Sequence, residues 1–423
     1  MPSAASLDRC FPRHTEFDPL VPVWCVTPNH GRAIHRFFDT SPISPSGRYL
    51  AVFRLPREER EPQPGEAGHV CLIDLETGED RVLAESRGWE TQMGANINWG
   101  SDDGQLIFND VDPQTWEAFA LNCDTRTGDR RRLGGPVYQV SPDGLWACAS
   151  NPTTMRRTQP GYGVVIPDER VPRYVGLRED DGLWLTHTQT GESKLILSLR
   201  DAVAGCTPPF EIDDPRRYEV YGFHSKFNSQ GDRLMFTIRF FPDEGKPVWN
   251  AMRTSTLYYT VLTCRLDGGE LYNAVPTSRW LKPGHHTNWF PDGRRLSMNL
   301  VLEDTMHFVQ CNLDGSDLRP MRTDVVGSGH PTVYPDGRHI LTDAYLMEEV
   351  SFGDGTIPLR WVDMAAGTEK LLARIPLDAG NPRGPLRLDP HPAWDRSWQW
   401  VTFNAFVGGT RRVFVMDMTH PPE

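Results

Sequence analysis

The chain has 423 residues, with 44 Lys and Arg against 56 Asp and Glu, so its formal net charge is −12. This charge argues against a nucleic-acid or anionic-membrane partner, because both need a basic face. No apolar run approaches the ~20 residues that span a bilayer, and segment 1–29 lacks the basic and apolar stretches of a secretory signal. We therefore expect a cytoplasmic protein whose eight scattered cysteines are reduced thiols.

One motif recurs seven times along the chain. It contains a polar residue, a short apolar stretch, a turn that usually holds Gly, and a second apolar strand. The copies begin at Ser41, Asn96, Val137, His224, His286, His330 and His391. Each copy predicts two short strands joined by a tight turn, because Asp-Gly and Ser-Gly favour the backbone of a hairpin.

A second hairpin follows most copies, as in the segments that begin at Val70, Phe119, Leu183 and Val309. Two hairpins make one four-stranded antiparallel blade. The last copy ends one strand short, and an unattached strand lies near the N-terminus at Val21. Pairing these two strands would complete the seventh blade and close the ring, which removes exposed sheet edges. The sequence therefore predicts an all-β, seven-bladed β-propeller that occupies residues 1–423 as a single domain.

Blade three should carry a long insertion at about 151–181, because Gly144 and the next turn glycine, Gly231, lie far apart. The insertion is rich in Pro, Gly and Arg, and its arginines are Arg156, Arg157, Arg170 and Arg173. A second irregular stretch covers 241–256. Long loops in compact domains are often functional, and Arg suits two-point binding of a carboxylate. The alternative is a pair of solvated, variable loops.

Four histidines occupy one register, the start of the predicted inner strand in four successive blades: His224, His286, His330 and His391. Tyr138 and Asn96 hold similar places in blades three and two. A propeller brings such positions together around its axis. Three readings stay open. The imidazoles could bind Zn²⁺ or Mn²⁺, one could act as a general base near neutral pH, or the set could line a structural polar channel. Asp343 and Asp389 could be further ligands or could orient the rings.

The runs HSKFN, HTNWFPDG, GSGHPTVYPDGRHILTDAY and HPAWD resemble the seven-bladed propeller polysaccharide lyases, which include oligogalacturonate, ulvan and rhamnose–glucuronate lyases. The resemblance spans nearly the whole chain. It implies β-elimination of uronate-containing glycans, with His224 as base and His286 and His330 as metal ligands. It also implies that Tyr138 is an acid/base group, with Arg156 or Arg157 as carboxylate neutraliser. Asn96 and Asn98 stand where ulvan-type relatives carry a catalytic histidine, and asparagine cannot act as a base.

We therefore interpret the chain as a lyase that acts on small uronate oligosaccharides. The predicted catalytic residues are His224, Tyr138, Arg156 and Arg157. The predicted substrate-binding residues are Asn96, Asn98, Tyr162 and Lys226, and the predicted ligands of a divalent Mn or Zn ion are His286, His330 and His391. Two alternatives remain: a non-catalytic TolB-like propeller that binds a glycan or a protein, and a metal-dependent hydrolase or epimerase that uses the same channel.

Overall fold

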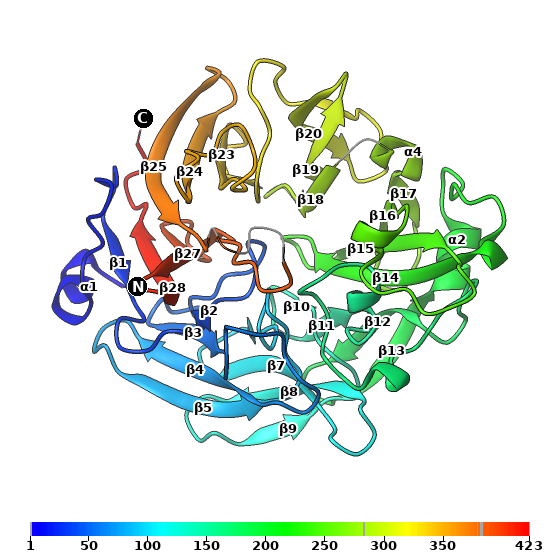
Figure 1. Ribbon diagram of the computed structural model, residues 1–423, viewed down its shortest axis with the longest axis horizontal. Helices are drawn as coiled ribbons and strands as arrows, with labels where there is room; N and C mark the ends of the chain where they lie inside the picture. The colour runs from blue at the N-terminus through cyan, green and yellow to red at the C-terminus, as the bar shows by residue number, and fades with distance from the viewer. Residues whose placement is uncertain (1, 282–283, 379, 381–383, 423) are drawn as a thin grey trace.

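Seven four-stranded antiparallel sheets are arranged in a ring in the computed structural model, which describes residues 2–281, 284–378, 380 and 384–422 (Figure 1). The predicted seven-bladed β-propeller is therefore confirmed. The first six blades run in chain order from the innermost strand outward, and short turns connect most neighbouring strands. Antiparallel neighbours can be joined by such short turns, which explains why a repeated turn motif was enough to predict the blades.

Blade one contains β2 (Ala33–Ile34), β3 (Tyr49–Arg54), β4 (Gly68–Asp74) and β5 (Asp80–Ser86), and blade two contains β6 (Asn98–Trp99), β7 (Gln105–Val111), β8 (Ala118–Asp124) and β9 (Arg130–Arg132). Blade three contains β10 (Gln139–Val140), β11 (Trp146–Ala149), β12 (Gly182–His187) and β13 (Ser193–Ser198). Blade four contains β14 (Tyr218–Phe227), β15 (Arg233–Pro242), β16 (Tyr258–Arg265) and β17 (Tyr272–Val275).

Blade five contains β18 (Gly284–Trp289), β19 (Arg295–Leu302), β20 (Thr305–Asn312) and β21 (Arg319–Pro320). Blade six contains β22 (Thr332–Val333), β23 (His339–Thr342), β24 (Thr356–Asp363) and β25 (Thr368–Pro376). Blade seven contains β26 (Ala393–Trp394), β27 (Trp400–Val407), β28 (Thr410–Asp417) and β1 (Val23–Cys25).

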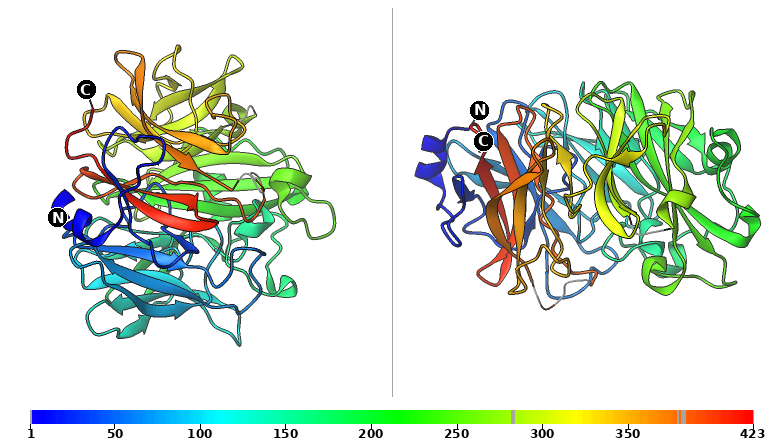
Figure 2. Two further views of the ribbon diagram at one scale, coloured as in Figure 1. Left: turned by 60° about the vertical axis from the view of Figure 1, so that its left-hand side comes forward. Right: turned by 90° about the horizontal axis from the view of Figure 1, so that it is seen from above.

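The N-terminal strand β1 is the outer strand of the seventh blade. It pairs antiparallel with β28, and Val23 lies opposite Met416. The turned views show this first strand, in blue, beside the last strands, in red (Figure 2). The strand that follows Val21 therefore pairs with the C-terminal strand.

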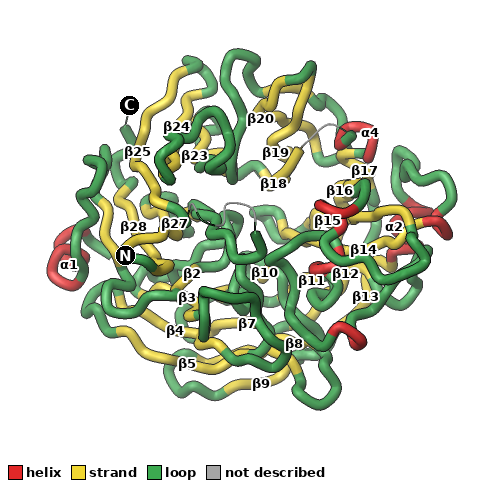
Figure 3. Tube along the Cα trace, in the orientation of Figure 1, coloured by secondary structure: helices red, strands yellow, loops and turns green. Residues whose placement is uncertain are grey.

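The short helices of the described residues lie before β1, between blades or within the connections of a blade. They are α1 (Ala4–Cys10), α2 (Leu199–Gly205), α3 (Ala251–Thr254), α4 (Thr277–Trp280) and the 3₁₀ turns η1 (Met155–Arg157), η2 (Asp168–Arg170) and η3 (Pro215–Arg217). Helices α1, α2 and α4 lie at the outer rim of the ring (Figure 3). Among the described residues, no helix is long and apolar enough to cross a bilayer.

The apolar core consists of separate clusters, most of which pack between neighbouring blades. One joins blades three and four through Leu183, Leu199 and Phe236, and another joins blades six and seven through Leu359, Trp394 and Phe403. All eight cysteines are free thiols and seven of them are buried, which agrees with the expectation of reduced cysteines. The predicted insertion of blade three lies between β11 and β12, where η1 and η2 are its only helical turns.

Candidate active site and metal centre

The four histidines of the shared register gather around one aromatic ring on the propeller axis. The ring of Phe37 lies 5.4 Å from His224, 6.2 Å from His286, 5.8 Å from His330 and 4.6 Å from His391, measured between ring centroids. His286 and His330 also approach each other to 3.9 Å. The propeller therefore brings together four residues that are far apart in the sequence.

Shifts in the pairing of two inner strands set the orientation of two of these imidazoles. The pairing of β14 with β15 shifts between Gly222 and Ser225, and the pairing of β18 with β19 shifts between His285 and Asn288. His224 and His286 lie inside these two bulges. A β-bulge re-aims side chains and is frequent beside active sites. His286 also has a positive φ of 60°, an uncommon conformation for a non-glycine residue.

A pocket of about 390 Å³ lies at one mouth of the ring and a pocket of about 570 Å³ lies at the other. We call the larger one the histidine pocket. Its walls come from blades four to seven, from the blade-three insertion and from the stretch 241–256. Its polar and charged lining residues are Gln159, Tyr162, His224, Thr237, Arg239, Arg253, Tyr259, His285, His286, Thr287, Tyr345, Glu348 and Arg387. This size and mixture of groups suits a small polar ligand.

His224 lines the histidine pocket as a candidate proton acceptor. Its Nε2 atom is buried and has no hydrogen-bond partner within the described part of the chain. Burial holds the pKa of His224 well below its ordinary value, and the nearby charges of Lys226 and Arg239 act in the same direction. The imidazole is therefore neutral at cellular pH and keeps a free lone pair.

Two arginines place positive charge in the same pocket. Arg239 from β15 is 7% exposed, donates to Gln159 Oε1 at 2.6 Å, and has an Nε–H without a partner among the described residues. Its guanidinium lies 3.4 Å from the ring of Phe223, which stacks on His224. Arg387 donates to Asp389 at 2.9 Å and lies 5.6 Å from the ring of Tyr162. These cations could bind a carboxylate beside the neutral imidazole.

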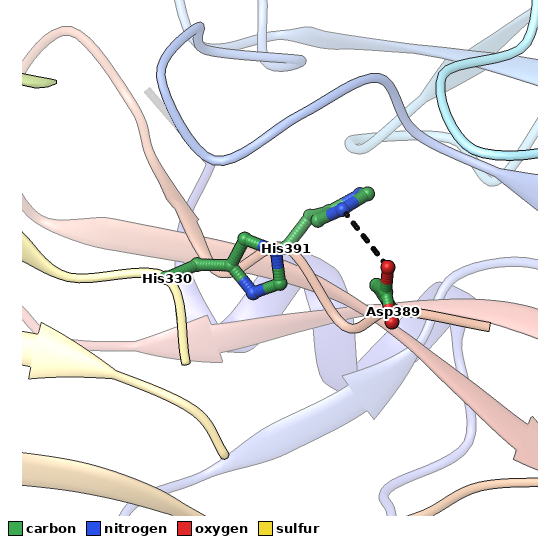
Figure 4. Close-up of side chains that lie close together, drawn as sticks. All are labelled: His330, Asp389 and His391. Carbon is green, nitrogen blue, oxygen red and sulfur yellow. Dashed lines mark ion pairs between the residues drawn. The ribbon is translucent and has the colours of Figure 1, made fainter. Parts of the chain in front are cut away.

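His330, His391 and Asp389 form the one cluster of metal-binding groups found among the described residues (Figure 4). Their candidate ligand atoms lie within 4.8 Å of one another, and His391 Nε2 is 3.9 Å from Asp389 Oδ2. Bonds of ~2 Å to one ion allow ligand atoms up to ~4 Å apart, so a small contraction would fit a metal.

The protonation of His330 supports this fit. Its Nδ1 lies 2.9 Å from both carboxylate oxygens of Asp343, so the ring carries its proton on Nδ1 and donates it there. The Nε2 lone pair is left without a partner among the described residues, as are both ring nitrogens of His391. A carboxylate that orients a ligating imidazole from behind is a common feature of protein metal sites.

His286, the third predicted metal ligand, has a different environment. Its Nδ1 donates to the carbonyl oxygen of Gly329 at 2.6 Å, and its Nε2 accepts from the hydroxyl of Tyr345 at 3.2 Å. The cluster of three groups therefore contains His330 and His391 from the predicted set, with Asp389 in place of His286. Burial lowers the pKa of His286 well below its ordinary value, so this ring is also neutral.

A charged and aromatic segment of blade one, which we call the channel plug, fills the axis behind the histidine pocket. It consists of Arg36, Phe37, Phe38 and Asp39. Arg36 pairs with Asp39 and donates to the carbonyl oxygen of Tyr138 at 2.6 Å. Lys226 reaches the same carboxylate at 3.0 Å. These side chains are at most 2% exposed, so two buried cations share one buried carboxylate in this network.

Four other predicted site residues belong to this network or line its edge. Asn96 accepts from Arg36 and donates to the carbonyl oxygen of Val137, and Asn98 donates to the carbonyl oxygens of Asn96 and Tyr138. The hydroxyl of Tyr138 is directed at Asp39 at 3.4 Å, and Lys226 donates to the carbonyl oxygen of Thr287. None of these four lines the histidine pocket, whereas Tyr162 does.

The two arginines predicted to neutralise a carboxylate stabilise the blade-three insertion. Arg157 is 2% exposed and donates to the carbonyl oxygens of Val171, Pro172 and Val248. Arg156 pairs with Asp168 at 3.0 Å, and both guanidinium groups stack on Trp249 from the second irregular stretch. These contacts hold the blade-three insertion against the stretch 241–256. Neither arginine lines the histidine pocket.

Sequence reasoning missed Arg239, Arg387 and Tyr345. Arg239 follows Ile238, which pairs with Gly222 close to His224, so the strand register could have indicated it. Arg387 precedes Asp389 by two residues in the segment that leads to His391. Its role depends on how that loop folds over Tyr162, for which the sequence contains no periodic signal.

The sequence matches no protein-family model, and a search of curated proteins finds no match. Solved structures are similar. An oligogalacturonate lyase in complex with manganese has a TM-score of 0.62 at 15% identity, covering 98% of this chain and 96% of that one. An oligogalacturonate lyase from Vibrio parahaemolyticus has a TM-score of 0.59 at 14% identity, covering 96% of each chain. A tricorn protease has a TM-score of 0.52 at 10% identity, covering 92% of this chain and 34% of that one. At these identities the similarity shows the propeller fold.

Proposed function

We propose that the protein is a lyase that cleaves short uronate-containing saccharides by β-elimination. The observation that carries the proposal is the neutral, unpartnered imidazole of His224 in a pocket that also holds Arg239 and Arg387. β-Elimination of a uronate needs both elements, because the C5 proton becomes acidic enough to leave only when the adjacent carboxylate is neutralised. The oligogalacturonate lyases to which the fold is similar support this reading.

Groups that line the histidine pocket can carry out each proton transfer that the elimination needs. Arg239 and Arg387 bind the uronate carboxylate. The His224 imidazole takes the proton from C5, the electrons of the C–H bond form a C4–C5 double bond, and the C4–O4 bond breaks. O4 leaves with a proton from an acid. Tyr162 is our candidate for that acid, because it lines the pocket with its ring centroid 5.7 Å from that of His224. Burial raises the pKa of the Tyr162 hydroxyl, which keeps the hydroxyl protonated.

A divalent cation such as Mn²⁺ or Zn²⁺ would be held by His330, Asp389 and His391, the donor set with unpartnered nitrogens. Such an ion, when bound, stabilises negative charge on oxygen atoms of the substrate. Asp343 would keep the proton of His330 on Nδ1, and Arg387, which is bonded to Asp389, would connect the cation site to the histidine pocket.

Replacing the orienting carboxylate tests the cation site. Asp343→Asn removes the acceptor that fixes the His330 proton, so we expect Mn²⁺ affinity to fall ~10–100-fold, measured by isothermal titration calorimetry on the metal-free protein. The matched control is Asp336→Asn, because Asp336 accepts from His339 at 2.6 Å in the turn between β22 and β23 of the same blade. Equal Mn²⁺ affinity in Asp343→Asn and the unmodified protein would refute this assignment of the ligands.

The pH dependence of activity follows from the environment of His224. Burial, Lys226 and Arg239 hold its pKa well below 6.5, while Asp39 opposes them. A base with a lowered pKa stays unprotonated as the pH falls, so kcat/KM should be constant from about pH 6 upward and decline only in more acidic buffer. A kcat/KM profile that falls with an apparent pKa near 6.5 would show that a solvent-exposed histidine is the base.

The unsaturated product provides the test of the proposed activity. Its double bond is conjugated with the carboxylate and absorbs in the ultraviolet, so absorbance should rise with at least one of oligogalacturonate, ulvan or glucuronate–rhamnose oligomers. Each substrate is assayed with Mn²⁺, with Zn²⁺ and with neither. No rise in any combination would favour the alternative of a non-catalytic propeller that binds a glycan or a protein.

A further inference from the structure

The candidate acid Tyr162 lies in a short segment, 159–163, through which the blade-three insertion reaches the histidine pocket. Pro160 and Tyr162 both line that pocket. A glycine stands on each side of the tyrosine, and both glycines have a positive φ, of 82° at Gly161 and 92° at Gly163. Glycine has more backbone freedom than any other residue, so the conformation of this segment is not fixed by its own sequence. Contacts with other segments must hold the Tyr162 ring in place.

Two neighbouring loops hold the part of the segment that precedes Tyr162. Arg387 donates to the carbonyl oxygen of Pro160 at 3.1 Å. The hydroxyl of Thr91 lies 3.2 Å from the carbonyl oxygen of Gly161 and donates to it. Both bonds involve carbonyl oxygens on the N-terminal side of the tyrosine, so a separate contact is needed to fix the backbone on its C-terminal side.

The carboxyl group of Glu90 provides that contact. Glu90 lies in the loop between β5 and β6, is 5% exposed, and accepts through Oε2 from the backbone N–H of Gly163. Gly163 is itself buried, and a buried N–H without an acceptor is costly, so this bond fixes the position of the backbone. Burial raises the pKa of Glu90 to about 8, so the carboxyl group that accepts this bond is largely neutral at pH 7.

The ring that this backbone carries is packed beside the proposed base. The centroid of the Tyr162 ring lies 5.4 Å from that of Phe223 and 5.7 Å from that of His224. The guanidinium of Arg387, which is proposed to bind the uronate carboxylate, lies 5.6 Å from the same ring. Because a displacement of ~1 Å can lower the rate of a reaction ~100-fold, the contacts that hold the ring also matter for proton transfer.

We propose that Glu90 is a positioning residue for the lyase reaction: it holds the backbone of Gly163 and thereby keeps the Tyr162 hydroxyl in place for proton transfer to O4. Glu90 does not line the histidine pocket and makes no ion pair with a described residue. A glutamate is rarely buried without such a pair, and this role accounts for it. The inference rests on the proposed function, in which Tyr162 is the acid.

The first test compares two substitutions of Glu90. Glu90→Gln keeps an oxygen acceptor on a neutral side chain of the same shape, whereas Glu90→Met fills the same space without a comparable acceptor. In Glu90→Met we expect kcat for a uronate oligosaccharide to fall ~10–100-fold. KM should change little, because Arg239 and Arg387 remain to bind the carboxylate. Glu90→Gln should restore kcat to nearly that of the unmodified protein.

The control for a general loss of stability is Asp395→Leu. Asp395 is 4% exposed and accepts from the backbone N–H groups of Gln399 and Trp400 in the turn between β26 and β27, outside the histidine pocket. This variant should lower the thermal unfolding midpoint and leave kcat of the folded protein unchanged. If Glu90→Met does not fold, Glu90→Ala, which has less bulk, replaces it.

A second readout does not require activity. In protein that contains 3-fluorotyrosine, the ¹⁹F NMR resonance of Tyr162 is identified as the one that is missing in Tyr162→Phe. We expect this resonance to move in Glu90→Met and to keep its position in Glu90→Gln and Asp395→Leu. An unchanged resonance in Glu90→Met would overturn the inference, whether or not the protein cleaves a uronate.

The activity measurements can also overturn the inference. An unchanged kcat in Glu90→Met would do so, as would an equal loss of kcat in Glu90→Gln or in Asp395→Leu. Absence of cleavage by the unmodified protein would instead refute the proposed function, and the Tyr162 resonance would still decide whether Glu90 holds the tyrosine in place.

Discussion

His224→Ala is expected to lower kcat for cleavage of a uronate oligosaccharide by ~10²–10⁴-fold, the usual contribution of a positioned general base. The variant removes a neutral imidazole that lines the histidine pocket beside Arg239 and whose Nε2 has no partner among the described residues. KM should change little, because the carboxylate is bound by the arginines. The measurement is the initial rate of ultraviolet absorbance, compared with the thermal unfolding midpoint of the same preparation.

The control for this variant is His69→Ala. His69 lies on β4 of blade one with its side chain 44% exposed, near Glu85, far from the propeller axis. It should retain full activity. If His224→Ala also retained full activity, another group would have to remove the proton, and the proposed mechanism would be wrong.

Asp39→Asn is expected to destabilise the fold by about 3–5 kcal/mol, the cost of leaving a buried charge without its partner. The Asp39 side chain is fully buried and contacts both Arg36 and Lys226, so the substitution leaves two cations facing a neutral amide. Urea unfolding followed by tryptophan fluorescence would measure the change. Asp8→Asn, which breaks an exposed pair with Arg13, is the control and should leave the unfolding midpoint nearly unchanged.

The Asp39 carboxylate also makes the stability of the fold depend on pH. Burial alone would raise the pKa of Asp39, but Arg36 and Lys226 outweigh it and lower the pKa below the ordinary value. A group with a lowered folded-state pKa stabilises the fold above its unfolded pKa, ~4, and loses that contribution as the pH falls further. Acid destabilisation should therefore be weaker in Asp39→Asn than in the unmodified protein. Equal acid sensitivity would contradict the assigned role of Asp39.

The fold was predictable because its signals are local. Each blade begins with a hairpin whose turn can be recognised in the sequence, such as the turn that contains Gly337. Because the pattern occurs seven times, the number of blades is more certain than any single strand boundary. The register of His224, His286, His330 and His391 could be predicted for the same reason, since equivalent positions of equivalent strands meet at the axis.

The residues that complete the site were harder to predict because they depend on contacts between distant segments. Arg156 and Arg157 look free in the sequence, but Trp249 and the backbone carbonyl oxygens of the insertion satisfy them. The channel plug precedes the first copy of the repeat and follows no periodic pattern. That Phe37 contacts four histidines is a property of the closed arrangement of blades, which no single segment encodes.

The masses of the products test the central claim most directly. A uronate oligosaccharide cleaved by β-elimination gives two products whose masses sum to that of the substrate, whereas hydrolysis adds one molecule of water. Mass spectrometry of a reaction in ¹⁸O-labelled water, with His224→Ala as control, distinguishes these outcomes. We predict an unsaturated product without solvent oxygen, formed by the unmodified protein and strongly reduced in His224→Ala. Products that contain ¹⁸O, or no cleavage of any uronate oligosaccharide, would contradict the assignment of the histidine pocket to a lyase.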